Sequence, residues 1–353
     1  MNNILKKNQI VLEFLVFICG MTVMVLEILG SRIMAPYFGN SIIVWTNIIG
    51  VIMLSLSIGY YFGGWLADKN PQETKFINII LLSGLTITAI APIYPRLFPW
   101  IQQHNWQLAY SSMFGVVSIM SIPNIFLGMV LPYATKLYTK NMERLAKSVG
   151  RLYALSTVGG IIGVFITGFY LIPSLGCKNL ILLLGIVLIL SALLGQTISR
   201  GMMFFSAIIV VIFVFFPNYN AAQNGQLLAI KESLYNTLKV YQKENNNQVH
   251  RFLMANNQVH SSICVSCENF LDNSYKIYEK AFCVKPDINN VLIVGGGGYS
   301  MATDILRSKD ISSLDVVEID PMMTALAQQY FELDNNDPRL SIYHEDGRVF
   351  LNQ

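Results

Sequence analysis

The chain carries little charge. Only 13% of its 353 residues are Asp, Glu, Lys or Arg, whereas 53% are hydrophobic. Soluble domains have about 25% charged residues, so this composition predicts a membrane protein. The formal net charge is only +3, and no basic run with interleaved aromatic residues occurs. Both features argue against nucleic acid as a partner.

Cysteine is also scarce, and its spacing excludes a disulfide framework. The five cysteines are Cys19, Cys177, Cys264, Cys267 and Cys283. We expect them to be reduced thiols. Cys264 and Cys267 form one Cys-x-x-Cys pair, but a zinc site needs a second pair or histidines at ligand spacing, and a thioredoxin-type motif needs a helix start. Ordinary packing is the simpler interpretation, so we predict no metal site and keep metal or redox chemistry as the alternative.

The N-terminal pattern also argues against a cleavable signal peptide. Lys6 and Lys7 precede a long apolar run with no small-residue cleavage site, which indicates a retained first span. Crossing a bilayer takes about twenty helical residues. About seven apolar segments approach that length, at residues 10–29, 42–66, 76–94, 108–131, 149–172, 180–198 and, shorter, 202–216. The glycines that crowd the second and fifth segments are typical of closely packed membrane helices.

Positive residues indicate how the spans are oriented. Lys69 and Lys75 follow the second span, and Lys136 follows the fourth, so these ends should be cytoplasmic. Seven crossings would place the residues after 217 outside the cell, whereas six would place them inside. The sequence leaves the side of the C-terminal domain open.

Two carboxylates fall in or near the first span. Glu13 and Glu27 are costly at membrane depth and are expected to pair or to serve function. Arg32 follows Glu27 by about one and a half helical turns and is the expected partner. A structural pair is the preferred interpretation, and a transport or polyamine-binding role is the alternative.

The composition changes to mixed polar and charged residues near residue 218. Short strand-like runs, LKVYQ and VHRFLM, are separated by Asn-rich turns and predict a small β region. Strands and helices then alternate from residue 291 to residue 343, which indicates a parallel sheet with crossover helices. The predicted fold is a multi-pass α-helical membrane domain (1–217), a small β region with a linking helix (218–285) and a partial Rossmann-like, methyltransferase-type α/β domain (286–353).

The chemistry-bearing residues follow the strands of this last domain. The run VLIVGGGG ends a buried strand in glycines, which let the backbone turn sharply and approach a ligand. The cluster matches the dinucleotide fingerprint only loosely, but Glu318 at the end of the next strand has the spacing of a ribose ligand. Asp346 and Gly347 after the third strand either hold an adenine amino group or cap a turn. Asp320 and Pro321 are typical of helix initiation.

The order of these motifs resembles a known family. ESLYNTLKV, RFLMANNQVHSS, VLIVGGGGYSMATDILRS, VVEIDPMMTALAQQYF and DPRLSIYHEDGRVFL together resemble the spermidine synthases, which are polyamine aminopropyltransferases. LEILGSRIMAPYFGNSIIVW and SIGYYFGGWLADKNP resemble the multi-pass segment fused to some members. The resemblance covers essentially the whole chain. It implies transfer of an aminopropyl group from decarboxylated S-adenosylmethionine, a co-substrate and not a permanently bound cofactor, to an amine such as putrescine.

The resemblance also implies roles for individual residues. The donor nucleoside would lie against Gly295, Gly296 and Gly297, with Glu318 on its ribose and Asp346 with Gly347 on its adenine. On the amine side, Asn236 and His260 stand where glutamines are usual in the family.

Several positions depart from the family pattern. Gly298 stands where soluble members have an acidic residue, and the pattern near Tyr278 and Glu279 is only partly present. The family's catalytic aspartate lies on a strand beyond Gln353. A primary amine is mostly protonated near neutral pH and needs a placed base, so no catalytic residue is assigned. We expect a truncated chain, and whether it is active stays open.

Two other functions share these features. A polyamine or small-molecule transporter or sensor would use the spans and Glu27, and the run GGWLADK resembles a loop signature of major-facilitator transporters. An S-adenosylmethionine-dependent methyltransferase would use the same glycine and acidic positions. The partners expected are the lipid bilayer of the cell membrane, a polyamine such as putrescine and a second copy of the chain in a homo-oligomer, but not nucleic acid.

Overall fold

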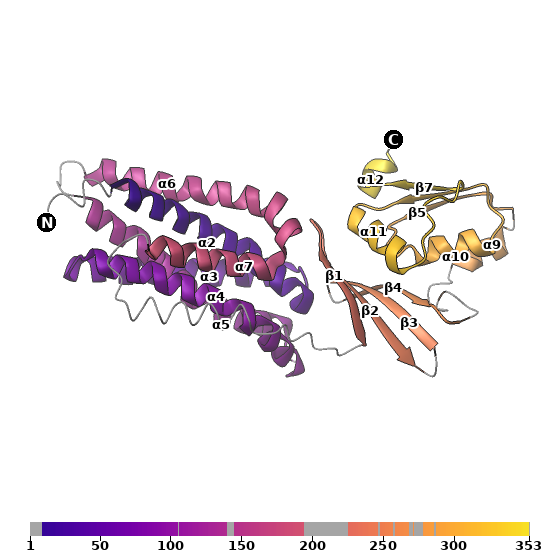
Figure 1. The fold of residues 1–353 in the computed structure, drawn as a ribbon, viewed down its shortest axis with the longest axis horizontal. Coiled ribbons are helices and arrows are strands. Elements are labelled where there is room, and N and C mark those ends of the chain that lie inside the picture. Colours follow the sequence, from indigo (N-terminus) through magenta and orange to yellow (C-terminus); the bar gives the residue numbers. More distant parts are fainter. Residues whose placement is uncertain are drawn as a thin grey trace. The chain divides into compact units, whose positions relative to one another are not determined.

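The chain divides into two compact units, Met1–Asn220 and Ala221–Gln353. The computed structural model (Figure 1) describes residues 9–104, 106–139, 145–193, 225–245, 248–256, 258–267, 271, 278–285 and 287–352. The units are treated separately below.

The first unit is helical. Its elements are α2 (Gln9–Phe38), α3 (Ile42–Lys69), α4 (Glu73–Gln103), α5 (Leu108–Tyr138), α6 (Leu145–Ile166), the π-helical segment η2 (Thr167–Leu171) and α7 (Ile172–Leu193). Within the described residues, five helices are long and apolar enough to cross a bilayer. They are compatible with a multi-pass membrane domain. The predicted seventh segment, residues 202–216, lies outside the described residues.

The fifth of these helices covers the predicted span 149–172 and the described part, up to Leu193, of the span 180–198. It runs over Ala146–Leu193, 48 residues, and is broken at Gly176, where φ is 76° and ψ is 157°. After this break the chain turns back, because Gly185 faces Thr88 and Ile189 faces Gly84, so α7 runs antiparallel to α4. Two helical segments joined at Gly176 therefore supply two passes along the bundle.

Glycines bring the helices of this unit into backbone contact. A Cβ at Gly59 of α3 would lie 2.3 Å from the carbonyl oxygen of Ile125 in α5. A Cβ at Gly159 of α6 would lie 2.3 Å from the carbonyl oxygen of Phe17 in α2. Such close approach is how small residues associate helices in lipid, as the glycine-rich second and fifth segments predicted.

The expected ion pair between Glu27 and Arg32 does not form. Glu27 makes no hydrogen bond or ion pair with any residue that the structure describes. Five residues turn a helix by about 140° beyond a full turn, so the two side chains lie on different faces. The paired carboxylate is Glu13, which accepts hydrogen bonds from the Tyr138 hydroxyl at 2.7 Å and from Arg151 at 2.9 Å.

The second unit begins with an antiparallel sheet of four strands in the order β1-β2-β3-β4. These are β1 (Gln226–Glu232), β2 (Thr237–Asn245), β3 (Gln248–Ala255) and β4 (Gln258–Cys264). The predicted Asn turn joins β3 to β4, where Asn256 has a φ of 47°. Asn tolerates this left-handed conformation better than most residues. The small β region is therefore as predicted.

A parallel sheet of three strands follows, in the order β5-β6-β7. Its elements are α9 (Glu279–Val284), β5 (Asn290–Val294), α10 (Ser300–Ser308), β6 (Ser313–Val317), α11 (Pro321–Tyr330), β7 (Leu340–Tyr343) and α12 (Gly347–Phe350). Both connections, β5 to β6 and β6 to β7, lead to the next strand in the same direction across the sheet. Because such crossovers are right-handed, α10 and α11 lie on the same face of the sheet, as Figure 1 shows. The predicted alternation of strand and helix is confirmed, and it is suggestive of a methyltransferase-like fold.

One face of this parallel sheet is buried and the other is largely open. Leu314 and Val316 of β6 are fully buried with Ile305 of α10. Alternate residues of the strands point to the opposite face of the sheet, where Leu292 is 44% exposed and Val294 is 53% exposed.

Candidate functional site

The glycine run lies between β5 and α10. Gly295 and Gly297 have φ values of 94° and 53°, which residues with a Cβ rarely adopt. A Cβ at Gly296 would lie 2.6 Å from the Tyr299 ring, and one at Gly298 would lie 2.6 Å from the Cβ of Ser261. Backbone conformation and lack of space thus both require glycine here. The loop leads directly into the first turn of α10, whose backbone N–H groups have no helical partner.

Glu318, directly after β6, is brought to this loop as the sequence predicted. Its side chain is 7% exposed, and its Oε2 atom accepts hydrogen bonds from the N–H of Gly296 at 2.8 Å and of Gly297 at 3.1 Å. Its Oε1 atom accepts the N–H of Asp320 at 2.9 Å. An ionised carboxylate has about four acceptor positions. Three are occupied within the chain, so one remains for a donor such as a ribose hydroxyl.

Asp320 begins α11, and Pro321 occupies the first position of that helix, as predicted. The Oδ1 atom of Asp320 accepts the N–H of Met322 at 3.0 Å. Its Oδ2 atom accepts the Ser233 hydroxyl at 2.5 Å. This second contact was not predicted, and it ties the turn between β1 and β2 to the carboxyl end of β6.

The turn after β1 positions Asn236. The Ser233 hydroxyl accepts the N–H of Asn236 at 2.9 Å, and the side-chain Oδ1 of Asn236 accepts the Nδ2 of Asn256 at 2.7 Å. Asn236 is thereby linked through Ser233 to Asp320, and through Asp320 to Glu318. A continuous polar network connects the predicted amine-side residue with the glycine loop.

His260 lies on β4 beside the loop, but its side chain is exposed. The neighbouring Ser261 makes the contact instead: its hydroxyl oxygen accepts the N–H of Gly298 at 2.8 Å and the hydroxyl of Ser300 at 3.2 Å. Adjacent residues of a strand point to opposite faces, so only one of the two can face the loop. Ser261 is a site residue that sequence reasoning missed.

Asp346 caps a helical turn, which is the second of the two roles predicted for it. Its Oδ1 atom accepts the N–H of Arg348 at 2.8 Å, which caps the first turn of α12. The hydrogen bonds from Arg348 hold the pKa of the Asp346 carboxyl below its usual value. Gly347 lies at the end of β5, because a Cβ there would be 2.5 Å from Cγ1 of Val294. The carboxyl ends of parallel strands are where α/β sheets bind ligands, and Glu318 and Gly347 both lie there.

Tyr299 fills the space beneath the loop. It is 1% exposed and has a φ of 55°, and its hydroxyl lies 2.7 Å from Oγ1 of Thr324, which in turn lies 2.9 Å from Nε2 of His344. Burial raises the pKa of Tyr299 to about 12. The Tyr278 hydroxyl donates to the buried carboxylate of Asp304, and burial with this hydrogen bond also raises the Tyr278 pKa. Neither phenol can act as a base near neutral pH.

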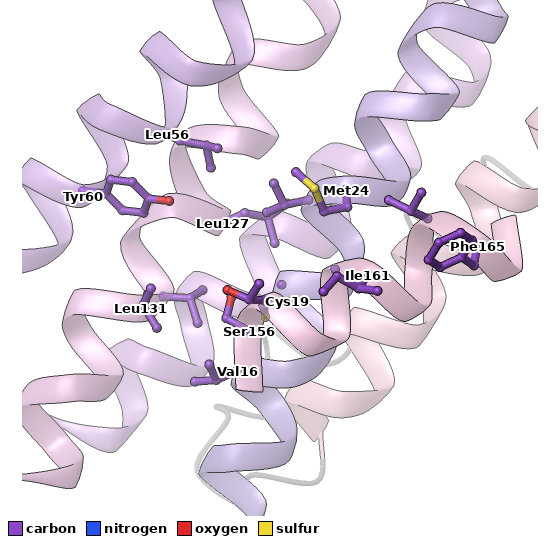
Figure 2. Close-up of a pocket in the computed structure, with 16 residues that line it drawn as sticks. Val16, Cys19, Met24, Leu56, Tyr60, Leu127, Leu131, Ser156, Ile161 and Phe165 are labelled. Atoms are coloured by element: carbon purple, nitrogen blue, oxygen red, sulfur yellow. The ribbon is translucent and has the colours of Figure 1, made fainter. Parts of the chain in front are cut away.

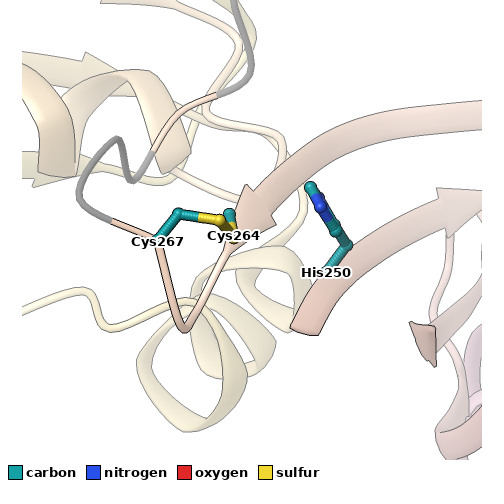
Figure 3. Close-up of side chains that lie close together, drawn as sticks. All are labelled: His250, Cys264 and Cys267. Carbon is teal, nitrogen blue, oxygen red and sulfur yellow. A yellow bond between two sulfur atoms is a disulfide. The ribbon is translucent and has the colours of Figure 1, made fainter. Parts of the chain in front are cut away.

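The cysteine prediction needs one correction. Cys264 and Cys267 form a disulfide, so the expectation of reduced thiols is wrong for this pair. Among the described residues, Cys19, Cys177 and Cys283 take part in no disulfide, as expected. His250 lies beside the pair, and the ligand atoms of the three residues are all within 4.8 Å of one another (Figure 3). A turn of the chain after β4 returns Cys267 to Cys264, which the spacing alone did not show.

The helical unit has a cavity of about 340 Å³ between α2, α3, α5 and α6. Figure 2 shows that apolar side chains such as Leu127 and Ile161 dominate its lining. The hydroxyl-bearing residues of the lining are Tyr60, Ser156 and Thr157. No charged residue lines it. A polyamine cation would find no counter-charge there, so the cavity does not favour polyamine transport.

Comparison with known proteins shows which family the C-terminal region resembles. Residues 274–353 match the sequence model of the spermine/spermidine synthase domain. A polyamine aminopropyltransferase of Alkaliphilus metalliredigens is 45% identical over 73 residues, which are 19% of this chain and 25% of that protein. Two longer matches include the helical unit. Polyamine aminopropyltransferase 1 of Streptomyces coelicolor is 20% identical over 96% of this chain and 66% of its own length.

The second longer match is a polyamine aminopropyltransferase of Leptospira interrogans, 22% identical over 88% of this chain and 61% of its own length. The chain thus spans from a quarter to about two thirds of the length of these relatives.

Proposed function

We propose that this chain is a membrane-bound polyamine aminopropyltransferase, because residues 274–353 match the sequence model of the spermine/spermidine synthase domain. It would transfer an aminopropyl group from decarboxylated S-adenosylmethionine to putrescine or a similar amine. The observation that carries the proposal is the contact of Glu318 with the glycine loop, at the ligand-binding edge of the parallel sheet.

The donor nucleoside would bind over this loop. Glu318 keeps about one acceptor position, which suits a ribose hydroxyl. Gly295 and Gly297 present backbone and no side chain, so the nucleoside can approach closely. Gly347 packs closely against Val294 at the same edge, and Asp346, which caps α12, would approach the adenine from that turn.

The reaction is a substitution at carbon. The amine nitrogen forms a bond to the aminopropyl carbon next to the sulfonium, and the carbon–sulfur bond breaks with its electron pair going to sulfur. The products are the extended amine and a neutral thioether nucleoside. The amine must lose a proton, and we assign that base to no residue of this chain. Asn236, and Ser261 in place of the outward-facing His260, would orient the amine at the β-sheet side of the loop.

The helical unit would hold the enzyme in the cell membrane. Lys69 and Lys136 lie at the ends of α3 and α5, and the positive-inside rule would favour this end of the bundle as the cytoplasmic one. A cytoplasmic location would suit a charged nucleoside donor.

Calorimetric titration of the full chain in detergent tests the proposal. Decarboxylated S-adenosylmethionine should bind the wild-type chain and the Glu332→Gln control, in which an exposed carboxylate is lost, but not Glu318→Ala. Binding of intact S-adenosylmethionine with equal affinity would point to a methyltransferase. No binding to a folded wild-type chain would refute the donor site.

A further inference from the structure

Three potential metal ligands meet at one end of the antiparallel sheet of the second unit. His250 on β3 is paired directly with Cys264 on β4 in the antiparallel register. Cys267 lies just beyond β4 and is bonded to Cys264. Figure 3 shows the three side chains close together, and their ligand atoms lie within 4.8 Å of one another. The cluster lies apart from Glu318 and the glycine loop, so the site described above does not account for it.

The chemistry of these side chains suits zinc. Tetrahedral Zn²⁺ binds thiolate sulfur at about 2.3 Å and imidazole nitrogen at about 2.0 to 2.1 Å, so two ligand atoms in such a site are about 3.5 to 4 Å apart. The observed separations need only side-chain rotation once the sulfur–sulfur bond is broken. Two thiolates and one imidazole supply three ligands, and water can take the fourth position.

The imidazole of His250 is available for this role. Its ring forms no hydrogen bond with any residue in the described part of the chain, and it stacks on Phe252 with ring centroids 6.3 Å apart. The strand pairing and the stacking hold the ring beside Cys264 without occupying its nitrogen lone pair. Cys264 is only 4% exposed, whereas Cys267 is partly exposed and can be reached by a small thiol.

We propose that His250, Cys264 and Cys267 form a redox-controlled binding site for Zn²⁺ or a similar divalent cation. In the reduced state the two thiolates and the imidazole bind the ion. In the oxidised state the thiolates are joined in the disulfide seen here, and the ion is released. The oxidant is a low-molecular-weight disulfide: two protein thiolates transfer two electrons to it, the protein disulfide forms, and two small thiolates leave.

Cobalt absorption tests this proposal on the full chain in detergent. Co²⁺ replaces Zn²⁺ in such sites, and thiolate ligands give it a strong charge-transfer absorption. Cys283→Ser is the background, because Cys283 is the exposed free thiol of the same unit. After reduction by a dithiol, this chain should bind one Co²⁺ with the thiolate absorption. Treatment with a small disulfide should remove the absorption, and renewed reduction should restore it.

Ligand variants then assign the site. In the same background, Cys264→Ser and Cys267→Ser should each reduce the thiolate absorption, and His250→Ala should weaken Co²⁺ binding at least tenfold. Unchanged affinity in His250→Ala would overturn the site as proposed, as would the absence of Co²⁺ binding by the reduced chain. The reduced and oxidised forms are compared in a chain that keeps all three ligand residues. A difference in Co²⁺ binding between these two forms therefore cannot come from the misfolding of a ligand variant.

Discussion

The backbone N–H of Gly296 donates a hydrogen bond of 2.8 Å to Oε2 of Glu318. The residue expected to bind a ribose therefore also holds the loop on which the nucleoside would lie. Because the same oxygen accepts the N–H of Gly297 at 3.1 Å, a substitution at Glu318 acts on the loop as well as on the ligand. Binding data for Glu318 variants need a separate measurement of loop order.

Hydrogen exchange provides that measurement. In Glu318→Ala, the partly buried amides of Gly296 and Gly297 lose their acceptor, and the loss of such a partner costs about 1 to 3 kcal/mol where the N–H is fully buried and less where water reaches it. Exchange of the loop peptide should accelerate about ten- to hundredfold. Glu332→Gln, which alters an exposed ion pair, should leave it unchanged. An unaffected loop in Glu318→Ala would show that the carboxylate does not order it.

Gly296 should not tolerate a side chain. In Gly296→Ala the new Cβ would lie 2.6 Å from the Tyr299 ring, which is itself 1% exposed and has no room to move. We expect a loss of about 1 to 3 kcal/mol of stability from overpacking. Gly64→Ala in the helical unit is the matched control, because nothing lies within 4 Å of that position. Thermal unfolding of both variants measures the difference, and equal melting temperatures would contradict the expectation.

Asp337 should contribute to stability in a defined pH range. Its carboxylate bonds to the Arg339 guanidinium at 2.7 Å, and the hydrogen bonds from Arg339 lower the Asp337 pKa. A lowered folded-state pKa adds stability that is fully present above the unfolded value of about 3.9 and is lost as the pH falls through the folded value. Below pH 4 the wild-type melting temperature should therefore fall more steeply than that of Asp337→Asn. Parallel curves would contradict this assignment.

The open face of the parallel sheet should make the second unit prone to association. Leu292 and Val294 are exposed on that face, and among the described strands β5 pairs with β6 alone, which leaves an edge. We expect the isolated segment 218–353 to aggregate, and Val294→Lys to reduce the aggregation. Light scattering during purification measures it. A monodisperse segment with a cooperative melting transition would contradict the prediction.

The local features of the fold could be predicted from the sequence. Glycine and Asn at turns, and apolar runs of strand or helix length, act through the backbone of a few neighbouring residues. Glu318 was placed correctly beside Gly296 because parallel strands end at one edge, whatever their side chains.

Contacts that depend on strand register could not be predicted. His250 meets Cys264 only because β3 and β4 pair in one register, and Ser261 replaces His260 at the loop because a strand reverses sides at each residue. The predicted partner of Glu27 failed for a related reason. Its spacing to Arg32 was read along the chain, whereas contact depends on the angle around the helix.

If the helical unit spans a membrane as proposed, the break at Gly176 has a consequence for the sidedness of the protein. Because α6 and α7 run in opposite directions on either side of it, the described helices make an even number of passes, and Leu193 returns to the end of the bundle where Gln9 begins. The second unit then lies on the same side of the membrane as Gln9 if the number of further crossings before Gln226 is even, and on the opposite side if this number is odd. Protease protection of that unit in sealed vesicles would read this parity directly.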